Sequence, residues 1–150
     1  MTQVCFVGAS DVDLRAELLS RETSRAALST YTLTEPFENS VGLETVSLGA
    51  AVALCNDLNW YLVRFVETTL IREPSISDEE WLSRSLAETV RDREIPPEET
   101  DRLLAIYGIE DGRPIEPMYV TRVEGSIPEY DLRDVEETIV VRVTEAEFPD

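Results

Sequence analysis

Residues 48–72 read LGAAVALCNDLNWYLVRFVETTLIR and form the longest stretch of the chain with a helical pattern. Ser47 precedes the stretch as a helix N-cap, and apolar residues recur along one side of it. They are Leu48, Ala51, Val52, Leu54, Cys55, Leu58, Leu62, Phe65, Val66 and Leu70. The spacing predicts one long helix at the centre of the core. Asp57 and Arg64 argue against a membrane span, because each charge costs about 2.5 to 3.5 kcal/mol on insertion scales.

Polar residues within this predicted helix supply the candidate cleft. At about 100° per residue Asn59 falls inside the apolar arc, where a buried amide needs a hydrogen-bond partner. Asp57 and Arg64 lie on the opposite face beside Trp60, and Arg64 can stack on that indole four residues away. Asn59 is a structural hydrogen-bonding group, a pocket wall, or a sign that the helix phase is wrong. If a ligand or partner cleft exists, we expect Asp57, Asn59, Trp60 and Arg64 to border it.

Strand and helix signals alternate before this stretch. Residues 2–7 are β-branched and aromatic and predict a strand, after which a helix runs from about residue 11 into the twenties. Residues 30–34 and 41–46 flank a turn-forming segment and predict the two arms of a hairpin.

The second half of the chain predicts two further helices and two strands. Residues 77–80 form a capping box ahead of an amphipathic helix that reaches residue 90. Residues 97–107 begin with proline and acids and predict another helix. Residues 115–123 and 138–143 predict late strands, joined by residues 125–137.

The order of these elements predicts an α+β fold in a single domain over residues 1–150. With residues 74–112 set aside as a two-helix insertion, the order approximates a ferredoxin-like βαββαβ core, an antiparallel sheet layered with helices. An alternative reads the three later helices and the final hairpin as a winged helix.

Composition removes several classes of chemistry. The chain has 31 acidic and 13 basic residues, a formal net charge of −18 and no histidine, and all its basic residues are arginine. Catalysis by histidine triads, lysine Schiff bases and histidine-ligated zinc is therefore excluded. Cys5 and Cys55 lie in apolar stretches, which is typical of buried free thiols in a reducing cytoplasm.

Local motifs give no catalytic, cofactor or metal site. The turn at residues 8–11 lacks a phosphate-binding glycine pattern and carries acids that oppose an anion. The acidic clusters are Asp13 with Glu17, Asp78–Glu80, Glu98 and Glu99 with Asp101, and Glu136–Glu137. Three of them stand at expected helix starts, where they complement the helix dipole. We therefore predict no catalytic residue, no cofactor and no metal ligand.

The acid-rich, lysine-free composition resembles that of proteins from salt-accumulating haloarchaea. The order of elements also resembles a small family of uncharacterised acidic haloarchaeal proteins, a domain of unknown function. The resemblance implies a halophilic, cytoplasmic setting and no particular activity.

These observations favour a non-catalytic protein-interaction or regulatory module, whose partner is another protein or a second copy. The contact surface would be a sheet edge or the region of Trp60 and Trp81. One alternative is a small divalent-cation-dependent enzyme whose carboxylates converge from distant segments. A second is a winged-helix-like DNA-binding regulator, but Glu98, Glu99 and Asp101 on its recognition helix would repel phosphate. We expect neither nucleic acid nor a membrane as partner.

The net charge predicts that folding requires salt. Mutual repulsion of the acids is screened when the Debye length shrinks to about 3 Å at 1 M salt. Far-UV circular dichroism should therefore show unfolding below a few tenths molar KCl. Cooperative folding at about 10 mM KCl, where screening is weak, would refute this expectation.

Overall fold

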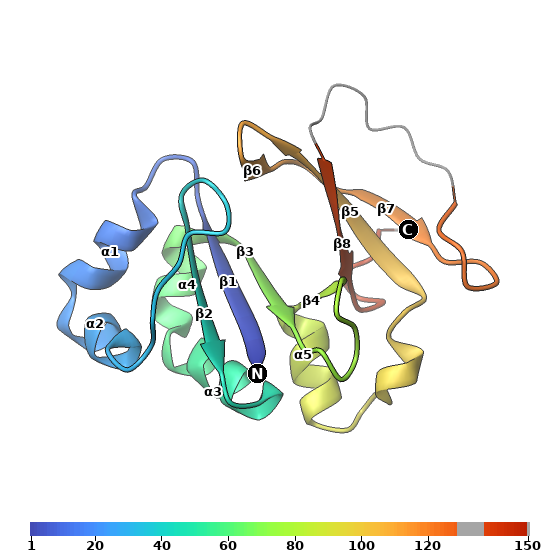
Figure 1. Cartoon of the computed structure of the whole chain (residues 1–150), viewed down its shortest axis with the longest axis horizontal. Coiled ribbons are helices and arrows are strands. Elements are labelled where there is room, and N and C mark those ends of the chain that lie inside the picture. The colour runs from blue at the N-terminus through green and yellow to red at the C-terminus, as the bar shows by residue number, and fades with distance from the viewer. Residues whose placement is uncertain (129–136, 150) are drawn as a thin grey trace.

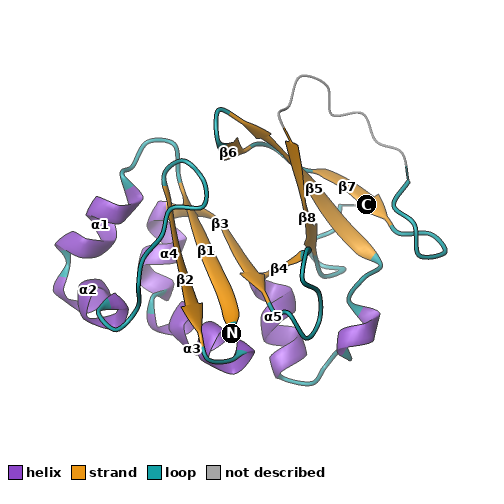
Figure 2. Cartoon of the chain, viewed as in Figure 1, coloured by secondary structure: helices purple, strands orange, loops and turns teal. Residues whose placement is uncertain are grey.

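Residues 1–128 and 137–149 are described by the computed structural model, which places strands from both ends of the chain in one sheet (Figures 1 and 2). The strands are β1 (Thr2–Gly8), β2 (Ser40–Thr45), β3 (Val66–Arg72), β4 (Trp81–Ser83), β5 (Leu103–Glu110), β6 (Arg113–Pro114), β7 (Met118–Thr121) and β8 (Glu137–Arg142). The helices are α1 (Leu14–Ser20), α2 (Glu22–Leu28), α3 (Leu48–Asp57), α4 (Asn59–Phe65) and α5 (Arg84–Arg91), with a 3-10 turn η1 (Pro97–Glu99).

The sheet has eight strands in the order β2-β1-β3-β4-β8-β5-β6, with β7 also paired to β5. Its pairs are antiparallel except for β4 and β8, which run parallel. The predicted α+β class is confirmed.

The predicted long helix over residues 48–72 is wrong in its last third. α3 and α4 follow each other with only Leu58 between them, and the chain then enters β3 at Val66 without a loop. Val66, Thr68, Thr69 and Ile71 are β-branched, which favours a strand, and β3 pairs with both β1 and β4. Tertiary pairing therefore overrides the helical spacing.

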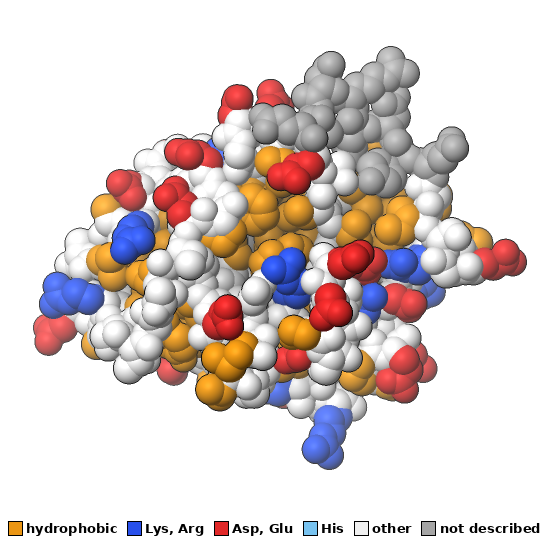
Figure 3. All heavy atoms as spheres, in the orientation of Figure 1, with side chains coloured by type: hydrophobic (Ala, Val, Ile, Leu, Met, Phe, Trp, Pro, Cys, Tyr) orange, Lys and Arg blue, Asp and Glu red, His pale blue; other side chains and the backbone are white. Residues whose placement is uncertain are grey.

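The two faces of the sheet bury separate clusters. All five helices contribute to one cluster, which includes Phe6 of β1 and Ile71 of β3. No helix residue belongs to the other cluster described, in which Cys5 and Leu70 meet residues of β4, β5 and β8. We call the side of the sheet that buries this second cluster the helix-free face. Figure 3 looks onto it and shows hydrophobic side chains gathered between the two ends of the sheet.

The ferredoxin-like arrangement is not confirmed. β2 and β3 lie on either side of β1 and are both antiparallel to it, so they run parallel to each other across α3 and α4, as in a split βαβ unit. The strands that flank α1 and α2, however, are β1 and β2, which are direct antiparallel neighbours. A second parallel unit is therefore missing from the predicted place.

Residues 74–112 are not the predicted two-helix insertion. They hold β4, α5, η1 and β5. Helix α5 confirms the later part of the first predicted helix, β4 replaces its start, and β5 replaces the end of the second. Ser83 caps α5 in place of the predicted cap at residues 77–80. The predicted helix over residues 97–107 gives way to β5, which begins at Leu103 and is apolar and almost wholly buried, as suits a strand between neighbours.

The remaining strand predictions hold in part. The strand over residues 138–143 is confirmed by β8, and that over residues 115–123 shortens to β7. The first arm of the predicted hairpin, residues 30–34, forms a single bridge between Thr34 and Gly42. Glu136 lies outside the described residues.

Gly42 lets the segment after α2 cross the edge of the sheet. A Cβ at residue 42 would lie 2.6 Å from the Thr34 hydroxyl oxygen and 2.7 Å from Cγ of Pro36. Residues 30–36, which we call the covering segment, therefore pass close along the outer edge of β2, where Thr34 pairs with Gly42 and Pro36 lies against the helix-free side.

Gly42→Ala should lower the free energy of unfolding by about 1–3 kcal/mol, because the added methyl group overpacks this crossing. Urea denaturation followed by circular dichroism measures the change. Gly49→Ala is the matched control: a Cβ there meets nothing closer than 3.8 Å, and alanine should stabilise helix α3 by up to about 1 kcal/mol. Equal changes in the free energy of unfolding for the two substitutions would contradict the close approach of the covering segment to Gly42.

Candidate functional site

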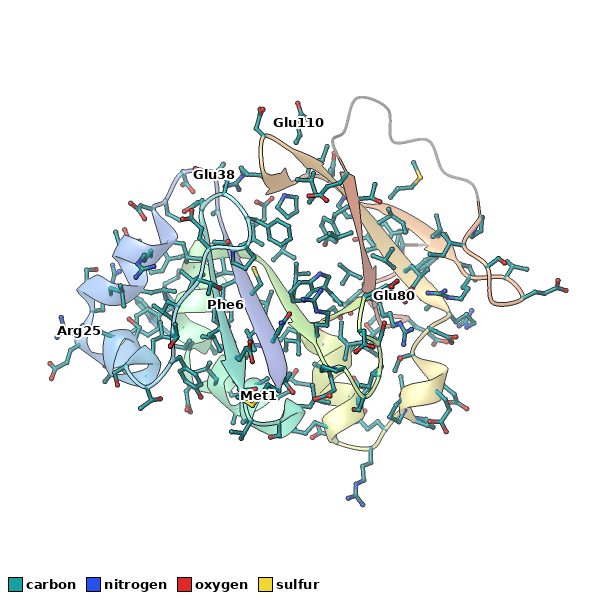
Figure 4. The ribbon with its side chains drawn as sticks, in the orientation of Figure 1. Met1, Phe6, Arg25, Glu38, Glu80 and Glu110 are labelled. Atoms are coloured by element: carbon teal, nitrogen blue, oxygen red, sulfur yellow. The ribbon has the colours of Figure 1, made fainter. Side chains whose placement is uncertain are left out.

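A cavity of about 650 Å³ opens beside the first residues of β1, between the covering segment and the sheet. Met1, which Figure 4 labels at this end of the strand, forms part of its wall. Gln3, Glu44 and Arg72 also line the cavity. Pro36, Trp81 and three threonines of the covering segment line it too. The cavity therefore combines apolar side chains and hydroxyl groups with the three polar residues Gln3, Glu44 and Arg72.

Strand register brings these three polar residues into one row. Gln3 of β1 is paired with Glu44 of β2 on one side and with Arg72 of β3 on the other. Residues two apart on a strand share a face, and Cys5 belongs to the cluster of the helix-free face. The row of Glu44, Gln3 and Arg72 therefore lies on that face, at the rim of the buried cluster.

The Arg72 guanidinium is held in place without a carboxylate. Its Cζ lies 4.4 Å from the centre of the Trp81 ring, and Nη2 donates a hydrogen bond to Oε1 of Gln3. Trp81 is only 6% exposed, so it forms a fixed floor under the guanidinium. Among residues 1–128 and 137–149, neither Arg72 nor Glu44 forms an ion pair.

The predicted residues around Trp60 lie elsewhere, on the outside of α4. Trp60 is 49% exposed and Val63 is 71% exposed. The Cζ atom of Arg64 lies 3.9 Å from the centre of the Trp60 ring, which confirms the predicted stacking. Arg21, between α1 and α2, lies 4.8 Å from the centre of the Phe65 ring and 6.0 Å from that of Trp60. We call these five residues the Trp60 surface.

Asn59 is exposed, so the prediction that it lies inside the apolar arc is wrong. That assignment relied on Leu48 and Val66 as neighbours, but Leu48 is only half-buried and Val66 belongs to β3. Asp57 is exposed as well, at the end of α3. The structure brings Trp60 and Arg64 together, and a cleft bordered by all four residues stays a prediction.

The two cysteines are free and buried, as predicted. Burial raises the pKa of the Cys5 thiol to about 12 and that of Cys55 to about 11. Both thiols are therefore protonated at neutral pH and are weak nucleophiles.

A partly buried ionic centre surrounds Glu80, which the sequence pattern had indicated only as part of a helix cap. Both carboxylate oxygens of Glu80 accept hydrogen bonds from Arg122 at 2.7 Å, and one accepts another from Arg142 at 2.7 Å. Arg142 also donates to the Thr100 hydroxyl group at 3.0 Å. The centre thus ties the residue before β4 to β8 and to the loops beside β5 and β7.

Two features expected from the alternative functions are not found in the described part of the chain. Within the described residues, no three acidic or cysteine side chains are arranged to hold a metal ion, so the convergence needed by a carboxylate enzyme is not found there. The predicted DNA recognition helix is replaced by β5. Among the described helices, none has the length and apolarity needed to cross a bilayer.

Comparison with known proteins places the chain in a family. A family model described as a family of unknown function (DUF5804) matches residues 2–109, and the chain belongs to this family. No curated protein and no solved structure is significantly similar to the chain. The matched range includes the Trp60 surface and the row of Glu44, Gln3 and Arg72.

Glu80→Gln should lower the free energy of unfolding at neutral pH by roughly 1.5–3 kcal/mol, because hydrogen bonds to a charged group are lost. Urea unfolding at fixed ionic strength measures this loss. Glu145→Gln is the control, since its pair with Arg102 is exposed and should contribute less than about 1 kcal/mol.

The effect of Glu80→Gln should also depend on pH. Burial alone would raise the pKa of Glu80, but the hydrogen bonds and charges of Arg122 and Arg142 outweigh burial and hold it below its usual range. The stabilisation is therefore full above the ordinary glutamate pKa of about 4.3 and is lost as pH falls through the lower, folded value. A difference between wild type and variant that grew on acidification would contradict this assignment.

Proposed function

We propose that this protein is a non-catalytic interaction module that forms a two-fold dimer through the Trp60 surface. The observation that carries the proposal is an indole that is half exposed yet held by Arg64, whose Cζ atom lies 3.9 Å from the ring centre, with the Cζ atom of Arg21 6.0 Å away. Trp60 also meets Tyr61 and Phe65 edge to face, with ring centres 5.1 and 6.2 Å apart. Because tryptophan and arginine dominate binding hot spots, this arrangement is preorganised for a protein contact.

Charge complementarity favours a second copy as the partner. Asp57 stands three residues before Trp60 and Arg64 four residues after it, and both are exposed. In a two-fold contact that pairs antiparallel helices across Trp60, Asp57 faces Arg64 of the second copy, and the reciprocal pair forms by symmetry.

The Trp60 surface also suits an acidic chain that repels itself. The chain has a formal net charge of −18, but this surface carries Arg21 and Arg64, and Arg21 forms an ion pair with Glu17. Approach here therefore brings together surfaces that carry basic groups, while a Debye length of about 8 Å at physiological salt screens the acids elsewhere.

Other contact surfaces considered from the sequence are less available. Trp81 is buried under Arg72 and cannot form a contact surface. At the outer edge of β2, Gly42 already exchanges two backbone hydrogen bonds of 2.8 Å with Thr34. The two buried free thiols support our inference of a reducing, cytoplasmic setting.

Trp60→Ala should convert the dimer to a monomer or weaken it by about 30-fold, as expected for a hot-spot residue worth about 2 kcal/mol. Sedimentation equilibrium at a KCl concentration that keeps the protein folded measures the association. Val46→Ala, which truncates another side chain, 80% exposed, is the control and should leave the dimer intact. A monomeric wild type, or a Trp60→Ala dimer of unchanged strength, would rule out this interface.

A charge exchange tests the two-fold geometry itself. Arg64→Asp alone should weaken the dimer, because two acidic groups then face each other across the axis. Adding Asp57→Arg should restore much of the affinity by exchanging the two charges. Failure of the double variant to recover any affinity would contradict the Asp57 to Arg64 contact.

A further inference from the structure

Two unpaired groups of opposite charge face the same cavity. Glu44 and Arg72 both line it, and both are cross-strand partners of Gln3. Their Cα atoms are two strand spacings apart, about 10 Å, with the neutral Gln3 between them. The cavity therefore presents a carboxylate and a guanidinium that do not neutralise each other, although each could serve a ligand.

Arg72 and Gln3 together form a site for a carboxylate. The Arg72 guanidinium lies over the Trp81 ring, and Nη2 donates a hydrogen bond to Oε1 of Gln3. The other N–H groups of Arg72 have no hydrogen-bond partner among the described residues. Because Gln3 uses its oxygen for Arg72, its NH₂ group remains a donor. Charge-assisted hydrogen bonds from a planar guanidinium suit a carboxylate group.

Glu44 complements this site with negative charge. Its side chain accepts no hydrogen bond within the described residues and can accept from an ammonium group. A simple anion would be repelled by a chain of formal charge −18. A zwitterion avoids that repulsion, because it carries no net charge and matches both ends of the row.

The rest of the cavity suits an apolar body. Met1 lines it together with Tyr31 and Pro36 of the covering segment, beside three threonines of the same segment. Its volume of about 650 Å³ lies within the usual range of small-molecule sites and exceeds that of a single amino acid. The geometry points to a binding site for a free α-amino acid with an apolar side chain, held by Arg72 and Gln3 through its carboxylate and by Glu44 through its ammonium group.

Fluorescence of Trp81 provides a direct test on the full chain. The chain has two tryptophans, so Trp60→Phe leaves Trp81, which touches Arg72, as the sole reporter. The probes are L-leucine and L-phenylalanine, each with two analogues that keep one charge. The carboxylate analogues are 4-methylpentanoate and 3-phenylpropionate, and the amine analogues are isoamylamine and phenethylamine.

At least one of the two amino acids should change the Trp81 emission saturably. Its two single-charge analogues should bind about tenfold or more weakly, because each leaves one end of the row unpaired. A carboxylate analogue that bound as tightly as its amino acid would overturn the role of Glu44. Absence of a saturable response to both amino acids would overturn the site.

Two substitutions test which residue binds the carboxylate of the ligand and which binds its ammonium group. Arg72→Gln should weaken binding of the amino acid and of the carboxylate analogue by about tenfold, whereas Glu44→Gln should weaken the amino acid and the amine analogue but spare the carboxylate analogue. Calorimetric titration measures each affinity without relying on the contact between Arg72 and Trp81. Glu44 is exposed, so its variant remains informative even if Arg72→Gln impairs folding.

Arg102→Gln and Glu145→Gln change the same charges at an exposed pair away from the cavity and should bind like the parent protein. Unchanged affinity in both Arg72→Gln and Glu44→Gln would overturn the inference. All ligand titrations use the Trp60→Phe background, in which the proposed dimer surface is already altered. Ligand binding is therefore measured independently of the dimer, and failure of one proposal can be distinguished from failure of the other.

Discussion

Strand β3 is the constraint on which the rest of the structure depends. It follows α4 directly and pairs with β1 and β4, so its register fixes what each of its side chains contacts. Ile71 enters the helix-covered cluster, whereas Leu70 enters the cluster on the helix-free face. Arg72 then emerges on the same face as Leu70. A shift of one residue would exchange these faces and place a charge under the helices.

The helix-free face changes from apolar to polar along β1, and the candidate cavity lies at that change. Cys5 has Gly42 and Leu70 as its cross-strand partners, while Gln3 two residues earlier has Glu44 and Arg72. Gly42 leaves room for the covering segment, which closes one side of the cavity. The helix-free face therefore supplies both a buried cluster and a polar rim.

Sequence patterns predicted the elements whose local signals and tertiary contacts agree. β1, β8 and the stacking of Arg64 on Trp60 are of this kind. The sequence pattern predicts helix for residues 66–72 and for most of β5, because a short apolar run fits both the helical and the strand spacing of side chains. Only pairing with distant strands shows that these segments are strands. Gln3, Glu44 and Arg72 could not be recognised for the same reason: their shared row exists only once the register of three strands is known.

Arginine chemistry explains how an acid-rich chain keeps cations available for binding. Arg122 and Arg142 are committed to Glu80, where they stabilise the join between distant segments. Each of the two tryptophans instead carries an arginine on its ring, Arg64 on Trp60 and Arg72 on Trp81. A planar guanidinium can stack through its face and still donate from its edge, which a lysine ammonium cannot do. Stacking therefore orients these two cations without neutralising them, and both remain free to meet a carboxylate that comes from outside the chain.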